Sequence, residues 1–415
     1  MRKPSVFVVL LTVFIDLVGF GIVLPLLPIY TRNLGGTGWM IGAIMASFSA
    51  MQFLFATSWG HLSDRIGRRP VLLVSTAGAA ISYAVFAFGS GLAAPVALWV
   101  LLGSRVFAGI CGANITVAQA YIADITSPSD RSRRMGLIGM AFGLGFIFGP
   151  ALGGVSLHLF GVQGPGWVAS AFCAINFVLT FAILPESWRP ASEHVASRPR
   201  LAQWLHTLGH PKIGLLVVVF FLATFCFSCF ETTLGLLVGR NFHLDVHRDQ
   251  DAKVIGYLFA YCGIIGASVQ GGAIGRMVKK NGEPRVIAKS LFLVALSMAP
   301  MPFVQGSGAG AWILLLAVLG VLSIGSSMTR PPVFGLISNL TPAHEQGATI
   351  GVAQSAGSLA RIIGPMFAAT LLDVSAPLPY LLCSGISLVT ALVVVQKLCR
   401  EPQSLKTTNA PDLAS

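Results

Sequence analysis

The chain has 415 residues, of which 54% are hydrophobic and only 10% are charged, and its formal net charge is +12. A soluble globular protein carries about 25% charged residues, so this composition excludes a water-soluble fold. The apolar residues form runs of about 20, the length of a membrane-spanning helix, and the ten-residue alternation of a membrane β-barrel is missing. We therefore expect an all-α polytopic membrane protein with the lipid bilayer as its solvent.

Twelve apolar segments are separated by short polar connections. They cover residues 5–31, 38–59, 70–90, 95–122, 134–160, 167–185, 213–239, 254–275, 286–304, 311–338, 346–372 and 377–398. A polar stretch divides them six and six, which predicts an N-terminal six-helix bundle (1–185), a cytoplasmic linker (186–212), a C-terminal six-helix bundle (213–398) and a cytoplasmic tail (399–415). The first segment is too long for a signal peptide and contains Asp16, so we interpret it as a retained span.

The distribution of basic residues predicts the orientation. If the N-terminus is cytoplasmic, the cytoplasmic connections hold 20 of the 27 Lys and Arg residues and the outer connections hold four. Because cytoplasmic loops are enriched in these residues, we expect both termini in the cytoplasm. The same asymmetry explains the net charge without a nucleic acid, so we expect no nucleic-acid partner.

The two halves contain repeated sequence. The stretch from 127 to 150 parallels the stretch from 341 to 365, because each is a polar loop followed by a glycine-rich span that carries a Gly-Pro pair. Two six-span halves of the same orientation are a recurrent plan among transporters, with the binding site between the halves near the midplane.

A short basic corner at residues 60–70 connects the second and third spans. Gly67 permits a tight turn, and Pro70 is suited to the first turn of the next helix. The corner has a second copy at 275–283, in which Lys279 stands where Asp64 would be. Gating on the inside should therefore depend on the N-terminal half.

Ionisable residues within the spans are the sharpest functional signal, because each costs at least about 2.5–3.5 kcal/mol at the bilayer centre on the insertion scale. They are Asp16, Arg105, Glu231, Arg330 and Arg361. The first four fall on spans 1, 4, 7 and 10. In a six-span repeat, span 1 corresponds to span 7 and span 4 to span 10, so we expect one central polar cavity. The alternative is interhelical ion pairs that only set packing, and for Arg361 we favour that alternative.

Asp16 and Glu231 are candidates for proton coupling, since a buried carboxylate can bind and release a proton during transport. The span that carries Asp16 also contains Pro25 and Pro28, so it can bend. Arg105 cannot deprotonate and could tune a neighbouring acid or hold an anionic group. The alternative for Asp16 is permanent pairing with an arginine.

Other polar side chains on the span faces are candidates to line a substrate cavity. These are Gln52, Asn114, Gln119, Tyr121, Tyr257, Tyr261, Ser327, Arg330 and Gln354. Ordinary interhelical hydrogen bonds are the alternative role for such residues. Scattered polar groups among many aromatic residues suit a bulky, partly hydrophobic solute.

Span 5 carries a stripe of small residues. Gly145, Gly149 and Gly153 recur every four residues, beside Pro150 and Gly154. A bare stripe lets another helix pack at close range, and Pro150 invites a kink. We expect a tightly sealed structural interface here.

The chain shows no sign of an enzyme. It contains no Gly-Lys pair and therefore no Walker A loop. The Cys226-x-x-Cys229 pair lies within an apolar span, so we interpret both as buried thiols. We expect a monomer that is not an enzyme, with no metal or cofactor and with the proton as its coupling ion.

Together these motifs resemble the major facilitator superfamily, and within it the twelve-span drug:proton antiporters, with similarity to bacterial tetracycline/proton antiporters. The resemblance rests on the corner at 60–70, on the span from Asp16 to Pro28, on Arg105 with Gly109, and on the glycine stripe of span 5. It extends from about residue 5 to residue 398.

The resemblance implies the superfamily fold and assigns roles to particular residues. It places Gly60, Asp64, Arg65, Gly67, Arg68 and Asp124 in a cytoplasmic gate, makes Asp16 the proton-coupling candidate with Arg105 as its electrostatic partner, and makes the stripe an antiporter packing motif (Gly145, Gly149, Pro150, Gly153, Gly154). It implies a proton-coupled antiporter of the bacterial inner membrane that exports a drug-like or amphiphilic small molecule. The alternatives are a uniporter or proton-driven importer of a metabolite, and a non-transporting membrane sensor.

Overall fold

The computed structural model describes residues 6–112, 114–126, 128–187, 200–244, 249–306, 308–342 and 345–399. The predicted tail beyond Cys399, most of the linker and the side chain of Asn114 lie outside the described residues. Within the described ranges the regular structure is helical throughout, with no strand.

The helices follow the expected order of spans. The first six spans are α1 (Val6–Val23) with α2 (Leu27–Asn33), α3 (Gly38–Ile66), α4 (Arg68–Ser90), α5 (Val96–Cys111) with α6 (Asn114–Asp124), α7 (Pro128–Phe160) and α8 (Gly164–Ile183). After the linker helix α9 (Arg200–Gly209) come α10 (Pro211–Asn241), α11 (Asp249–Ser268) with η1 (Val269–Ala273) and α12 (Ile274–Asn281), α13 (Glu283–Met298) with η2 (Met301–Phe303), α14 (Ala309–Ser327) with α15 (Arg330–Leu340), α16 (Gln346–Val374), and α17 (Pro377–Val394) with η3 (Val395–Cys399).

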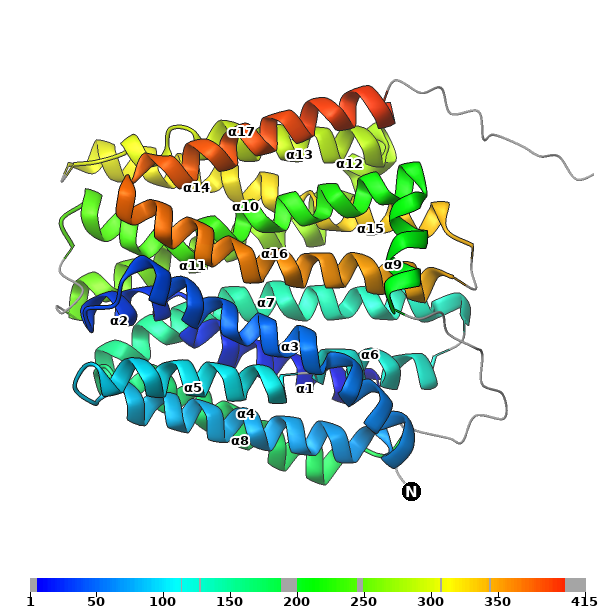
Figure 1. Cartoon of the computed structure of the whole chain (residues 1–415), viewed down its shortest axis with the longest axis horizontal. Coiled ribbons are helices and arrows are strands. Elements are labelled where there is room, and N and C mark those ends of the chain that lie inside the picture. The colour runs from blue at the N-terminus through cyan, green and yellow to red at the C-terminus, as the bar shows by residue number, and fades with distance from the viewer. Residues whose placement is uncertain are drawn as a thin grey trace, which may run out of the picture.

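Eleven of these spans are long and apolar enough to cross a membrane within the described residues. The twelfth expected span is α7, whose 33 residues extend about 50 Å at about 1.5 Å per residue. The helices run side by side along the long axis, with the early spans in one half of the picture and the late spans in the other (Figure 1). The prediction of an all-α membrane protein with two six-helix bundles is confirmed.

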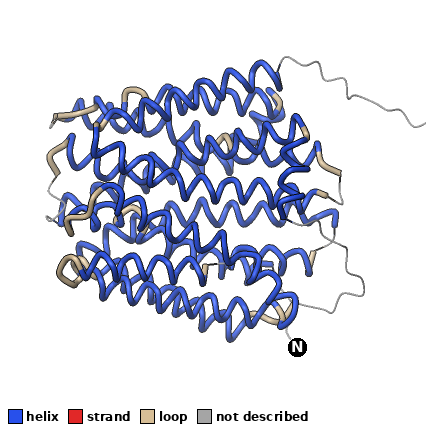
Figure 2. The backbone as a smooth tube through the Cα atoms, viewed as in Figure 1, coloured by secondary structure: helices blue, strands red, loops and turns tan. Residues whose placement is uncertain are grey.

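Both described ends of the chain lie at the same end of the bundle, the end at which helix α9 runs crosswise (Figure 1). The connecting loops gather at the two ends of the helices (Figure 2). An even number of spans requires this arrangement of the termini. That this end faces the cytoplasm stays a prediction from the Lys and Arg distribution.

The corner between α3 and α4 is shorter than the sequence predicts. Helix α3 continues to Ile66 and α4 begins at Arg68, so the helix extends beyond the apolar run that was predicted to end at residue 59. The apolar run ends there, but the backbone hydrogen bonds continue as the helix leaves the membrane. Gly67 alone makes the turn, with φ +101°, and Gly282 makes the matching turn in the second half with φ +77°. The backbone therefore repeats as the sequence does.

Spans 1, 4 and 10 are each broken into two helices. A break leaves backbone carbonyls without helical partners, which is costly inside a bilayer. In span 4, three consecutive carbonyls, those of Ile110, Cys111 and Gly112, accept hydrogen bonds from the side chains of Trp59, Ser75 and Gln52 respectively. Side chains of α3 and α4 thus stabilise the break, which lies within the half of span 4 that follows Arg105.

The glycine stripe of α7 packs against α1. A Cβ added at Gly149 would lie 2.6 Å from the backbone of Gly21, and one at Gly145 would lie 2.8 Å from Leu17 Cβ. Such separations are shorter than any real Cβ contact, so only glycine permits this approach. The expected tight interface is present, and its partner is the first span.

The two halves meet along two pairs of helices, α7 with α11 and α3 with α16. At the first pair, a Cβ on Gly256 would lie 2.8 Å from the carbonyl oxygen of Pro150. At the second pair, Gly42 faces the backbone of Met366 with no room for a side chain. Backbone-to-backbone packing therefore closes both seams.

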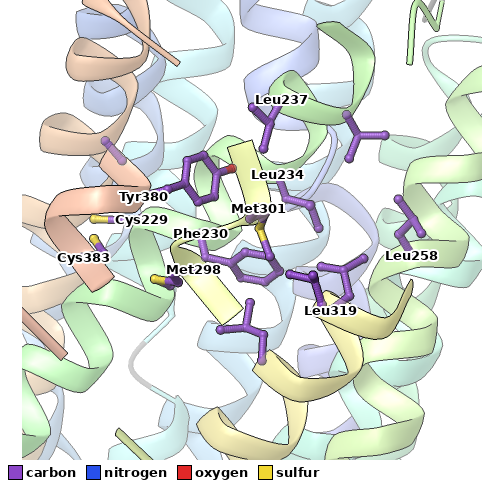
Figure 3. Close-up of a cluster of buried hydrophobic side chains, with 14 of the residues drawn as sticks. Cys229, Phe230, Leu234, Leu237, Leu258, Met298, Met301, Leu319, Tyr380 and Cys383 are labelled. Atoms are coloured by element: carbon purple, nitrogen blue, oxygen red, sulfur yellow. The ribbon is translucent and has the colours of Figure 1, made fainter. Parts of the chain in front are cut away.

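Helix α10 is held by a hydrophobic core in the second half. Phe230, Leu234 and Leu237 pack with Met298 and Tyr380 (Figure 3). The thiols of Cys226 and Cys229 are free and buried, as the sequence predicts. Because Phe230 is anchored in this core, the next residue, Glu231, projects from a fixed helix.

We expect Gly149→Ala to destabilise the protein, because the new Cβ must push α1 and α7 apart. Overpacking of this kind costs about 1–3 kcal/mol. Gly103→Ala is the matched control, since Gly103 also lies in a span and a Cβ there meets nothing within 4 Å. Thermal unfolding of the purified variants measures the difference. Equal melting temperatures for the two variants would contradict the close packing of α1 and α7.

Candidate functional site

A small cavity lies between the two halves. It is lined by Phe20, Leu24, Leu27, Met45, Phe48, Ser49 and Arg105 from the first half and by Ser228, Glu231, Arg361 and Pro365 from the second. Three of the five ionisable residues predicted within spans therefore share one cavity. Asp16 and Arg330 are not among the residues that line it.

Close packing of α10 against α16 positions Glu231 and Arg361. A Cβ on Gly364 would lie 3.2 Å from the carbonyl oxygen of Phe225, so glycine brings the two helices together. Glu231 is 8% exposed, and its carboxylate lies within electrostatic reach of the Arg361 guanidinium. Arg361 thus interacts across helices, as the alternative role considered for it predicts, and it also lines the cavity.

Arg105 forms part of the opposite wall. Its guanidinium carbon lies 4.9 Å from the centre of the Phe48 ring and 5.7 Å from that of Tyr83, and it also interacts with the Tyr83 hydroxyl. Gly109, one turn later, lets α5 lie directly against the backbone of α3 at Phe48. The guanidinium therefore makes cation–π contacts with both rings.

Asp16 faces α8. Its carboxylate accepts a hydrogen bond of 2.8 Å from the side-chain amide of Asn176, which also donates to the carbonyl of Thr12. The ring of Tyr83 packs beside Gly19, one turn from Asp16. Tyr83 thus lies near both Asp16 and Arg105, and the partnership of these two charges stays a prediction.

The sequence analysis did not single out Asn176 or Tyr83. A lone Asn or Tyr within an apolar span is a weak signal when taken alone, because either can form an ordinary interhelical hydrogen bond. The signal becomes clear only when α8 is known to pack against both α1 and α4.

The side chain of Asn114 lies outside the described residues, and none of the other eight predicted substrate residues is among the described residues that line the cavity. Gln52 donates to the break in span 4, the Tyr121 hydroxyl donates to the carbonyl of Pro185, and the Tyr261 hydroxyl donates to that of Leu316. Arg330 and Gln354 hydrogen-bond each other at 3.4 Å. Tyr257 is exposed, Ser327 is buried and Gln119 is half-buried. As substrate contacts these residues stay predictions.

The predicted gate residues Asp64, Arg68 and Asp124 come together at the corner between α3 and α4. Arg68 is 8% exposed, and its guanidinium bridges the carboxylates of Asp64 at 2.5 Å and Asp124 at 3.1 Å. These three residues come from α3, α4 and α6, so the cluster ties three helices of one half together. Arg65 is exposed, and Gly60 faces open space.

Glu186 is a functional residue that the sequence analysis missed. One carboxylate oxygen accepts from the backbone N–H of Arg68 at 2.9 Å and the other from that of Arg69 at 3.0 Å. A carboxylate at a helix N-terminus satisfies free N–H groups and interacts favourably with the helix dipole. Gly67 leaves room for it, since a Cβ there would meet Glu186. The sequence analysis placed Glu186 in the polar linker, where such charges are usually solvated.

A second carboxylate acts in the same way at the opposite end of the bundle. Asp373, at the end of α16, pairs with Arg32 at 2.5 Å and accepts from the backbone N–H of Gly38 at 2.5 Å. Arg32 and Gly38 belong to the first half and Asp373 to the second. We call this arrangement the Asp373 latch, and it was also missed, because all three residues lie near span ends.

Comparisons with known proteins agree with this geometry. The family model described as Major Facilitator Superfamily matches residues 9–365 and 271–413. The tetracycline resistance protein, class E, of Escherichia coli is 32% identical over 374 residues, which are 88% of this chain and 87% of that protein. The human major facilitator superfamily domain-containing protein 10 is 30% identical over a gapped alignment of 456 positions, which covers 98% of this chain and 95% of that protein.

Solved structures show the same fold. The crystal structure of the human organic anion transporter MFSD10 is 26% identical, covers 95% of this chain and 100% of its own, and gives a TM-score of 0.67. The crystal structure of the nucleoside transporter NupG gives a TM-score of 0.72 at 13% identity, over 94% of this chain and 98% of its own. The second likeness concerns the fold alone.

We expect Glu186→Ala to loosen the start of α4, because the N–H groups of Arg68 and Arg69 lose their acceptor. Loss of a cap costs about 0.5–2 kcal/mol. Hydrogen–deuterium exchange of peptides that span residues 67–72 should become faster. Glu283→Ala, in the first turn of α13 after the equivalent glycine, is the control and should leave those peptides unchanged. Unaltered exchange in Glu186→Ala would rule out the capping role.

Proposed function

Because the chain belongs to the major facilitator superfamily, we propose that it is a proton-coupled antiporter that exports an amphiphilic, drug-like small molecule. The family and fold are those of multi-pass membrane transporters rather than of enzymes. The observation that carries the proposal is the cavity between the halves, where a buried carboxylate, Glu231, stands among apolar and cationic side chains. The tetracycline resistance relatives support export.

Glu231 is the proposed site of proton exchange. It lines the cavity between the two halves. When the carboxylate is ionised, it attracts the Arg361 guanidinium. Protonation of Glu231 removes this electrostatic attraction. A change in the balance of buried charge biases the equilibrium between two conformations by its differential free energy.

Asp16 is the second proposed carrier of the proton. Its carboxylate is hydrogen-bonded to Asn176, and Tyr83 interacts with both Asp16 and Arg105. Protonation of Asp16 would therefore change the electrostatic environment of Arg105 through Tyr83. The two carboxylates therefore differ in access: Glu231 faces the cavity and Asp16 is enclosed by α8.

Two gates would alternate in this mechanism. On the side that we propose to be cytoplasmic, the cluster of Asp64, Arg68 and Asp124 stiffens the first half. On the opposite side, the Asp373 latch joins the halves. The proposed location is the bacterial inner membrane, where an inward proton gradient is available to drive export.

We expect Glu231→Gln to abolish transport driven by a pH gradient, because the neutral amide cannot exchange a proton. The assay uses proteoliposomes with an imposed pH gradient and radiolabelled tetracycline as the probe. Substrate exchange without a gradient should persist, which controls for folding. Asp16→Asn, measured in parallel, should reduce the driven rate less than Glu231→Gln does. Driven transport at the wild-type rate in Glu231→Gln would remove Glu231 as the coupling site, and transport insensitive to a protonophore would favour a uniporter.

We expect Asp64→Asn to lower the transport rate about tenfold while the protein stays folded in the membrane, since Arg68 loses one of its two carboxylates and a charge-assisted bond contributes about 1.5–3 kcal/mol. Lys279→Gln is the control at the equivalent place in the second half. Rates are normalised to the amount of monodisperse protein. An equal loss in both variants would contradict the asymmetry between the two corners.

A further inference from the structure

Arg105 is a buried cation whose counter-ion is missing from the described part of the chain. It is 1% exposed, and no carboxylate among the described residues lies within 4 Å of it. The Tyr83 hydroxyl interacts with the guanidinium, but the Nε atom is buried without a hydrogen-bond partner. A buried charge is stable only when it is paired or hydrogen-bonded. The missing partner can therefore be supplied by a molecule that enters the cavity.

The charges around the cavity lead to the same conclusion. Its lining contains two guanidinium groups, Arg105 and Arg361, and one carboxylate, Glu231. Glu231 and Arg361 lie on neighbouring helices of the second half and interact with each other. The excess positive charge therefore lies on the opposite wall, at Arg105.

The surroundings of Arg105 suit an apolar body attached to an anion. The rings of Phe20 and Phe48 lie 4.9 Å apart, and Phe48 is also the ring beneath the guanidinium. Leu24 and Met45 extend this apolar surface along the same wall.

We propose that Arg105 is an anion subsite: the substrate carries a carboxylate or similar anionic group that pairs with this guanidinium, while its apolar body lies against Phe20 and Phe48. This inference rests on the proposed function, because it takes the cavity as the transport site. A planar, doubly hydrogen-bonded pair with a carboxylate is the interaction for which a guanidinium is best suited.

The net charge of the substrate follows from Glu231. A simple anion binds more tightly when Glu231 is protonated, because the repulsive carboxylate is neutralised. A zwitterion whose basic group faces Glu231 binds more weakly then, because the proton competes with that group. Only the second case gives exchange of substrate for proton, so antiport and an anionic subsite together require a zwitterion.

The test compares probes that share one ring system and differ in charge. 2-Naphthoate is the anion, methyl 2-naphthoate the neutral ester and naphthylalanine the zwitterion, and their affinities are measured by isothermal titration on the purified full chain at pH 6 and pH 8. We expect each carboxylate probe to bind at least about tenfold more tightly than the ester. We expect this preference to disappear in Arg105→Gln and to persist in Arg240→Gln, which removes the same charge from the exposed end of α10.

Equal affinity for the acid and the ester in the wild-type protein would overturn the subsite, and this comparison needs no variant to fold. A preference that survives in Arg105→Gln would overturn it as well. The outcome is separable from that of the proposed function. Driven export that remains intact with no preference for carboxylates rejects the subsite alone, whereas a preference that depends on Arg105 with protonophore-insensitive transport rejects the coupling alone.

Discussion

The structure depends on helices that approach each other more closely than any side chain permits. The glycine stripe on α7 packs so closely against α1 that no Cβ fits between the two helices. The same helix packs Pro150 against Gly256 of the other half. In a bilayer, such packing replaces the hydrophobic effect as the force between helices. Because α7 contacts both its own half and the other, the seam that closes the cavity and the packing that builds the first half share one helix.

This packing leaves the buried charges unequally distributed. The second half carries Glu231 and Arg361 near each other, whereas the first half brings only Arg105 to the cavity and turns Asp16 toward Asn176. The N-terminal wall is thus a cation on an aromatic surface, and the C-terminal wall is an acid–base pair. Electrostatic forces inside such a site are stronger than in water, so the state of one carboxylate governs the charge of the whole cavity.

The sequence predicted the features that local pattern determines. Glycine spacing identified the stripe on α7, and the six-span repeat indicated that Arg105 and Glu231 would share a cavity. The polar residues that would line the cavity were less predictable, because the sequence does not show which neighbouring helix each helix face contacts. Gln52 and Tyr121 donate hydrogen bonds to backbone carbonyls instead. The sequence could not predict that Glu186 and Asp373 cap other helices, because their partners lie 118 and 335 residues away in the chain.

Helix α3 connects the Asp373 latch at one end of the bundle to the cluster of Asp64, Arg68 and Asp124 at the other. Its 29 residues extend about 44 Å at about 1.5 Å per residue; one end is bonded to Asp373 of the other half, and the opposite end is bonded through Asp64 to its own half. The Asp373 latch is partly exposed, at 39% and 35% for the two side chains, and exposed pairs contribute only about 0–1 kcal/mol. Breaking this ion pair therefore requires little free energy and is sensitive to screening by salt, whereas the packing of Gly42 against Met366 near the same end is not. The ionic strength of the surrounding medium thus becomes a determinant of how firmly the two halves are joined at that end.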